Sequence, residues 1–125
     1  MEESREEKGY EVLGRLLPDS TGAIPDSAGV PTNMNDLARL VIEHVFADSW
    51  ARPGLDLRTK SFITLGILIA QGSGHALERN FHAALNLGIT KEEIVEVLIH
   101  TLVYCGGPRT NEATSLARRV FAQRS

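Results

Sequence analysis

Cysteine is almost absent from the sequence, since Cys105 is the only one among 125 residues. A single cysteine excludes a disulfide within the chain and also excludes a Cys-x-x-Cys redox pair. Because Cys105 lies in an apolar stretch, we expect a small buried hydrophobic side chain there. A nucleophilic thiol is the alternative.

Basic clusters and long apolar runs are missing as well. The formal net charge is −3, and Lys and Arg form no run interleaved with aromatic residues, which argues against nucleic acid as a partner. The longest apolar stretch, Phe62–Ala70, is shorter than the roughly 18 residues that a membrane span needs. The opening segment MEESREEKGYEV is charged and lacks the apolar centre of a signal peptide. These absences predict a soluble, cytoplasmic protein that binds neither nucleic acid nor a membrane.

Strand patterns are scarce too, because almost every apolar run repeats with a helical period. We therefore predict an all-α fold, a single domain over residues 1–125 with about six helices. The expected helices cover approximately residues 6–17, 35–47, 57–71, 75–87, 90–106 and 111–123. Residues 19–33 form a loop of uncommon length, and such loops are often functional.

Several helix ends carry specific signals. Ser4 with Glu7, and Thr90 with Glu93, have the spacing of a capping box at a helix start. Gly88 is expected just past the end of the helix over 75–87. Pro108 is expected to prevent the preceding helix from continuing.

The expected helices over 57–71 and 90–106 are too apolar for a domain of this size to bury alone. The segment FITLGILIA is apolar all round, which is typical of a helix buried on every side. We expect the surplus apolar surface to form a subunit interface in a symmetric homo-oligomer.

The segment GHALERNFHAALNLG places His75, Glu78 and His82 on one side of a helix. A carboxylate and an imidazole at the edge of a core suit general acid–base catalysis. Two histidines and a carboxylate also form a known metal-ligand set. The alternative is an ordinary surface Glu–His pair. His44 and His100 lie on apolar helical faces, where each is either a hydrogen-bonded core histidine or a catalyst.

The segment WARPGLDLRTK contains Trp50, Arg52 and Arg58. Arginine binds carboxylates through two parallel hydrogen bonds, so Arg52 or Arg58 is a candidate clamp for an acidic substrate. In the alternative interpretation, Trp50 packs against neighbours and the arginines pair with Asp56 or with another subunit.

Four segments together resemble one family: EKGYEVL, WARPGLDLRTKSFITLGILIA, HAALNLGITKEEIVEVLIHTLVYCGGP and NEATSLARRVF. They are similar to the carboxymuconolactone decarboxylase family, part of the alkylhydroperoxidase D-like superfamily, mainly over residues 50–121. The resemblance implies an all-α subunit assembled into a ring, often a trimer or hexamer, with pockets near subunit contacts. It also implies a reaction that removes a carboxyl group from a butenolide without a cofactor. Electrons flow through the ring C=C to the lactone carbonyl, and a carbon is then protonated.

The sequence departs from the family at its usual chemical positions. Asn80 stands where members usually carry a histidine, and Ala76 where a glutamate is common. The redox branch of the superfamily has cysteines at the positions of Ser73 and Ala76 and a glutamate at that of Ser61. His82 falls where many relatives have an arginine. These departures argue against peroxidase or disulfide-reductase activity, and they leave open which residue supplies the proton.

The resulting hypothesis is a cofactor-independent decarboxylase or isomerase that acts on a small carboxylated lactone or related oxygenated acid. In this hypothesis Arg52 or Arg58 holds a carboxylate, while Trp50 and the loop over 19–33 help close the pocket. The expected catalytic residues are His82, Glu78 and Asn80. The expected substrate-binding residues are Trp50, Arg52, Arg58, His44, His100 and Tyr104. No metal ion or cofactor is expected. The alternatives are a non-catalytic relative that kept the fold and a metal enzyme using His75, Glu78 and His82.

Overall fold

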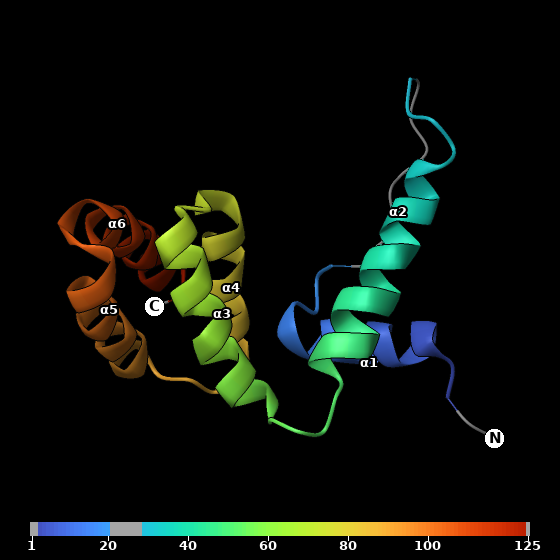
Figure 1. Ribbon diagram of the computed structural model, residues 1–125, viewed down its shortest axis with the longest axis horizontal. Helices are drawn as coiled ribbons and strands as arrows, with labels where there is room; N and C mark the ends of the chain where they lie inside the picture. Colours follow the sequence, from blue (N-terminus) through green and yellow to red (C-terminus); the bar gives the residue numbers. More distant parts are fainter. Residues whose placement is uncertain (1–2, 21–28, 125) are drawn as a thin grey trace. The chain divides into compact units, whose positions relative to one another are not determined.

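The computed structural model describes residues 3–20 and 29–124 (Figure 1). The chain divides into two compact units, Met1–Leu55 and Asp56–Ser125. Every regular element in the described ranges is a helix, as predicted. The helices are α1 (Arg5–Leu16), α2 (Met34–Leu40), the π-helical η1 (Val41–Trp50), α3 (Leu57–Gln71), α4 (Gly74–Asn86), α5 (Lys91–Cys105) and α6 (Gly107–Gln123). None of these helices has the length and hydropathy needed to cross a lipid bilayer.

In the first unit, α1 begins at the predicted capping box. The backbone N–H of Glu7 donates to Ser4 Oγ, and the backbone N–H of Ser4 donates to the Glu7 carboxylate, both at 3.1 Å. These bonds satisfy donors that a helix start otherwise leaves without partners. The helix buries Val12, Leu13 and Leu16.

The second predicted helix is confirmed but extends further than expected. α2 continues directly into η1, whose final turn has the wide π pattern in which the Ala51 N–H donates to the Phe46 carbonyl at 2.9 Å. The helix therefore ends at Trp50, not before residue 48. Its buried residues are Ile42 and Ala47. The expected apolar stripe is exposed instead; it comprises Leu37, Leu40, Val41, His44 and Val45.

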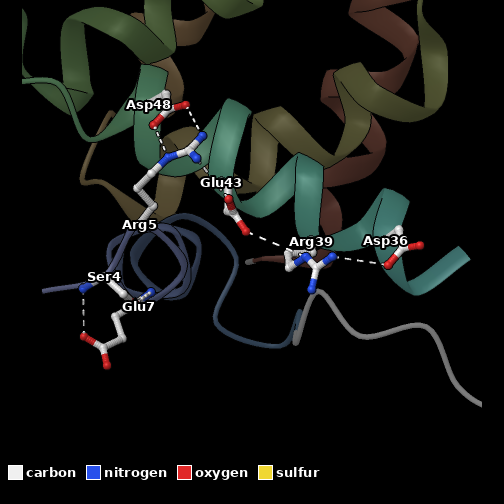
Figure 2. Close-up of polar contacts among 7 residues, drawn as sticks. All are labelled: Ser4, Arg5, Glu7, Asp36, Arg39, Glu43 and Asp48. Carbon is white, nitrogen blue, oxygen red and sulfur yellow. Dashed lines mark hydrogen bonds and ion pairs between the residues drawn. The ribbon is translucent and has the colours of Figure 1, made fainter. Parts of the chain in front are cut away.

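Helices α1 and η1 pack closely at Gly9, where a Cβ atom would lie 2.3 Å from the Ile42 carbonyl oxygen. Arg5 adds a polar connection between them (Figure 2). Its Nε donates to Asp48 at 2.9 Å, and its guanidinium pairs with Glu43 at 3.1 Å. The hydrogen bond from Arg5 lowers the pKa of Asp48 below its usual value.

The second unit begins with α3, whose N-cap is Asp56. The backbone N–H of Thr59 donates to Asp56 Oδ1 at 2.7 Å. Hydrogen bonds from the Thr59 side chain and backbone lower the pKa of Asp56. The helix ends at Gly72, which has a φ of 68°, a left-handed conformation that favours glycine.

The remaining helix ends are confirmed in part. Gly88 has a φ of 88°, and Thr90 and Glu93 form the predicted capping box of α5. The last helix begins at Gly107, about one turn before the expected start. Pro108 lies in its first turn, where a missing N–H breaks no helical hydrogen bond, so here it starts a helix.

Helix α3 packs against α4 and α5, and α6 packs against α4 and α5. Their core is apolar and is made by Leu65, Ile69, Leu77, Phe81, Ala84, Ile89, Ile94, Leu98, Ala113, Ala117 and Val120. The expectation that α3 is buried on every side is wrong for the single chain, because Ile67 is 51% exposed. Helix α5 likewise exposes Val95, Ile99, Leu102 and Val103. The predicted surplus of apolar surface is therefore present, and the ring-shaped oligomer stays a prediction.

Candidate active site

A cavity of about 530 Å³ lies between α3 and α5 in the second unit. Its size is within the range of small-molecule sites. Apolar and polar side chains both line it, namely Phe62, Gly66, Glu93, Glu96, Val97, His100 and Thr101. A helix that presents apolar and titratable residues to one cavity meets the basic requirement of an active site.

Arg58 lies beside this cavity, near the start of α3. Its guanidinium pairs with Glu93, and its Cζ lies 5.4 Å from the centre of the Phe62 ring. Both of these neighbours line the cavity. Because Arg58 and Glu93 are each close to the start of their helix, α3 and α5 run side by side in the same direction (Figure 1).

His100 lines the cavity two turns after Glu93 on α5, about 10 Å further along the helix axis. Glu96 precedes His100 by four residues, so the two side chains share one face of α5. The His100 and Tyr104 rings contact each other, with centroids 5.4 Å apart, and Tyr104 is 79% exposed. His100 is itself exposed, so its interpretation as a core histidine is wrong.

Glu78 and His82 lie elsewhere, on the side of α4 that faces α6. Glu78 pairs with Arg119 at 3.7 Å, and His82 Nε2 lies 3.1 Å from Gln123 Oε1. The other ring nitrogen of His82 lies 3.5 Å from an Arg124 nitrogen. Neither Glu78 nor His82 lines the cavity between α3 and α5.

The residues that the resemblance assigns to the family's usual chemical positions have local partners. Asn80 is half-buried, and its Nδ2 donates to the Ala76 carbonyl of its own helix at 2.8 Å. Ser73 Oγ lies 3.3 Å from Gln71 Oε1, and Ser61 is buried. The Asn80 bond uses one of the two N–H groups of its amide and leaves the second N–H available as a donor.

Three expected substrate-binding residues belong to the first unit. His44 lies 4.0 Å from Asp48 and its side chain is 83% exposed, so it is not a core histidine. Trp50 is half-buried and Arg52 is exposed. In the loop over 19–33, residues 21–28 lie outside the described residues.

The structure places His100 in the lining of this cavity and Arg58 beside the cavity, with Tyr104 adjacent to His100. Sequence reasoning missed the contributions of Phe62, Glu93 and Glu96 to this cavity. The four-residue spacing of Glu96 and His100 could have predicted that these two residues share one face of a helix. The Arg58–Glu93 pair had no such signal, because 35 residues separate the partners.

Cys105 is half-buried and carries no disulfide. In the ranges 3–20 and 29–124, no three His, Cys, Asp or Glu side chains are placed to hold a metal ion. The arrangement of His75, Glu78 and His82 therefore gives no support to the alternative of a metal enzyme.

Comparison with known proteins places the sequence in a family. The carboxymuconolactone decarboxylase family model matches residues 35–119. A 4-carboxymuconolactone decarboxylase from Acinetobacter baylyi is 34% identical over 86 residues, which are 69% of this chain and 64% of the relative. A nitrosuccinic acid decarboxylase from Metarhizium robertsii is 38% identical over 82 residues, 66% of this chain and 57% of the relative. An uncharacterized 15.0 kDa protein from Paracoccus denitrificans is 31% identical over 96 residues, 75% of this chain and 69% of the relative.

The chain therefore belongs to the carboxymuconolactone decarboxylase family. Its matches span less than two thirds of the length of either decarboxylase.

Proposed function

We propose that this protein is a cofactor-independent carboxy-lyase or isomerase that acts on a small carboxylated lactone or related oxygenated acid. The cavity between α3 and α5 carries the proposal, because a guanidinium lies beside it and an imidazole lines it. The names of the two decarboxylases to which the chain is similar support the reaction class.

Arg58 is the proposed anchor for the substrate. A guanidinium binds a carboxylate through two parallel hydrogen bonds, and the Phe62 ring beside it provides an apolar surface for the substrate body. Glu93 already pairs with Arg58, so an incoming carboxylate competes with Glu93 for part of the guanidinium. We propose that Arg58 binds a carboxylate that stays on the substrate and not the one that leaves as CO₂. Binding the leaving carboxylate would stabilise the ground state and so raise the barrier to decarboxylation.

His100 is the proposed proton donor. The bond between the substrate carbon and its carboxylate breaks, CO₂ leaves, and the electron pair moves through the C=C bond to the lactone carbonyl. The imidazolium of His100 then protonates carbon, and water restores the proton on His100. Glu96 lies on the same face of α5, four residues before His100, and lines the same cavity.

Enzyme variants distinguish catalysis by His100 and Arg58 from catalysis by His82 and Glu78 on α4. The substrates are 4-carboxymuconolactone and nitrosuccinic acid, and the readout is CO₂ release. We expect His100→Gln to lower kcat by about 100-fold or more, the usual contribution of a general acid. Arg58→Gln should mainly raise KM, whereas Arg79→Gln, at an exposed position on α4, serves as the charge-matched control. A loss of turnover in His82→Gln and Glu78→Gln, with His100→Gln unaffected, would transfer the site to α4.

A non-catalytic relative is the second candidate function, and the amide of Asn80 favours it, because an amide cannot carry a proton between groups at neutral pH. The resemblance leads us to expect a histidine at this position, whereas Asn80 donates one N–H to the carbonyl of Ala76 in its own helix. Failure of the folded wild-type protein to release CO₂ from either substrate would favour this candidate.

We further propose that the chain forms a ring-shaped homo-oligomer, a trimer or hexamer, through its exposed apolar surface. The exposed side chains of Ile63 and Ile67 on α3 and of Val103 on α5, which line neither of the two cavities, support this proposal. Light scattering coupled to size-exclusion chromatography gives the subunit number, and a monomer would contradict the proposal.

A further inference from the structure

A second cavity, of about 380 Å³, lies between α5 and α6. Its lining residues are Val95, Leu98, Ile99, Leu102, Thr110, Thr114, Ala117, Arg118 and Phe121. No carboxylate lines it, in contrast to the cavity between α3 and α5. No histidine lines it either. This cavity therefore has groups that can bind a ligand but lacks the imidazole that donates a proton in the proposed reaction.

Thr110 provides an unusual polar group in this apolar lining. Thr110 is only 7% exposed, and its Oγ1 has no hydrogen-bond partner in the described part of the chain. The neighbouring Thr114 differs, because its Oγ1 donates to the Thr110 carbonyl at 2.8 Å. A buried hydroxyl without a partner destabilises a fold. Almost none of the Thr110 Oγ1 surface is accessible, so a ligand oxygen reaches it once the Thr110 side chain turns about χ1 toward the cavity. The hydrogen bond formed there would remove this cost.

Arg118 provides positive charge at the same cavity. It is exposed and forms no ion pair within residues 3–20 and 29–124, whereas the adjacent Arg119 pairs with Glu78. Lys91 adds a second cation nearby, with its Nζ 5.8 Å from the centre of the Phe121 ring. The local charge therefore favours an anion.

The spacing of the two polar groups limits the length of a ligand. Thr110 and Arg118 are eight residues apart on α6, a rise of about 12 Å. Long side chains on a helix lean toward its N-terminus, which shortens the gap between the Arg118 guanidinium and Thr110. A carboxylate and a hydroxyl separated by a chain of about six carbons match this reduced gap.

We propose that the cavity between α5 and α6 binds a small carboxylic acid that has an apolar body and a second oxygen at its far end. The carboxylate pairs with Arg118, the body packs on Leu98 and Phe121, and the distal oxygen hydrogen-bonds to Thr110. This site is separate from the cavity proposed for catalysis, so its occupancy does not depend on the proposed reaction.

Three probes of similar length test the two polar contacts: 6-hydroxyhexanoate, hexanoate and 1,6-hexanediol, each titrated by calorimetry into the protein of 125 residues. We expect 6-hydroxyhexanoate to bind most tightly. Arg118→Gln should weaken both acids by about tenfold, the effect of losing one charged hydrogen bond, and leave the diol unchanged. Thr110→Val should make the affinity for 6-hydroxyhexanoate equal to the affinity for hexanoate.

Arg119→Gln is the matched control, because it removes the same charge at the next position, outside the cavity lining. Amide chemical shifts should locate the bound probe on α5 and α6, and circular dichroism shows whether each variant is folded. The proposal is overturned if none of the probes binds, if the diol binds as well as the acids, or if Arg118→Gln and Arg119→Gln weaken the acids equally.

Discussion

His82 on α4 and Gln123 at the end of α6 lie 3.1 Å apart, between Nε2 of the ring and the side-chain oxygen. Arg124 reinforces this contact, since it donates to Asn86 Oδ1 at 2.8 Å. His82 thus joins two helices that pack against each other in the second unit. Its structural role can be measured separately from a catalytic one.

Replacing His82 with alanine is expected to lower the free energy of unfolding by about 1 kcal/mol, the net contribution of one hydrogen bond. Gln123→Ala should have a similar effect, because it removes the same contact from the other side. Urea denaturation measures both. If His82→Ala leaves stability unchanged while turnover disappears, the catalytic assignment of His82 gains support over the structural one.

Thr110→Val is expected to raise the free energy of unfolding by about 1–2 kcal/mol, because the buried hydroxyl has no partner among the described residues. Thr114→Val is the control, since that hydroxyl already donates to a carbonyl and its removal gives no such gain. Thermal unfolding without ligand measures both variants. Equal or lower stability of Thr110→Val would show that the Thr110 hydroxyl is satisfied in the unliganded protein.

Gly9→Ala is expected to destabilise the first unit by about 1–3 kcal/mol, because the new methyl group would overlap the Ile42 carbonyl oxygen. Gly14→Ala, in the same helix, meets no atom within 4 Å. It should therefore stabilise α1 by about 0.5–1 kcal/mol through the better helix propensity of alanine. Hydrogen exchange of the α1 amides compares the two variants. Similar protection in both would contradict the close packing of α1 against η1.

The Arg5–Asp48 pair predicts acid sensitivity in the first unit. The pKa of Asp48 is lowered in the folded state by the Arg5 hydrogen bond. Its contribution to stability is therefore complete above the unfolded pKa of about 3.9 and is lost as pH falls through the lower folded value. Hydrogen exchange of the α1 and η1 amides, followed from about pH 6 to about pH 2, measures the stability of the first unit. Protection of these amides should decrease over the acidic part of this range. Asp48→Asn should reduce this decrease in protection at low pH. If Asp48→Asn and the wild type show the same pH dependence, the stabilising role of the Arg5–Asp48 pair is contradicted.

The sequence was sufficient for the features that depend on near neighbours. The helical period predicted the all-α fold, and the Ser4–Glu7 and Thr90–Glu93 spacings located two helix starts. Gly88 was correctly placed at a helix end. These signals succeed because a helical turn and its caps form between residues three or four positions apart.

The placement of the candidate site depended on the packing of distant segments. Arg58 meets Glu93 only because α3 and α5 lie side by side, and this gives the cavity lined by His100. Glu78 and His82 matched an active-site pattern, yet both contact α6. Periodicity indicates which residues share a helical face but not which helix that face meets. That choice follows from the packing of the whole core, which only the tertiary structure decided.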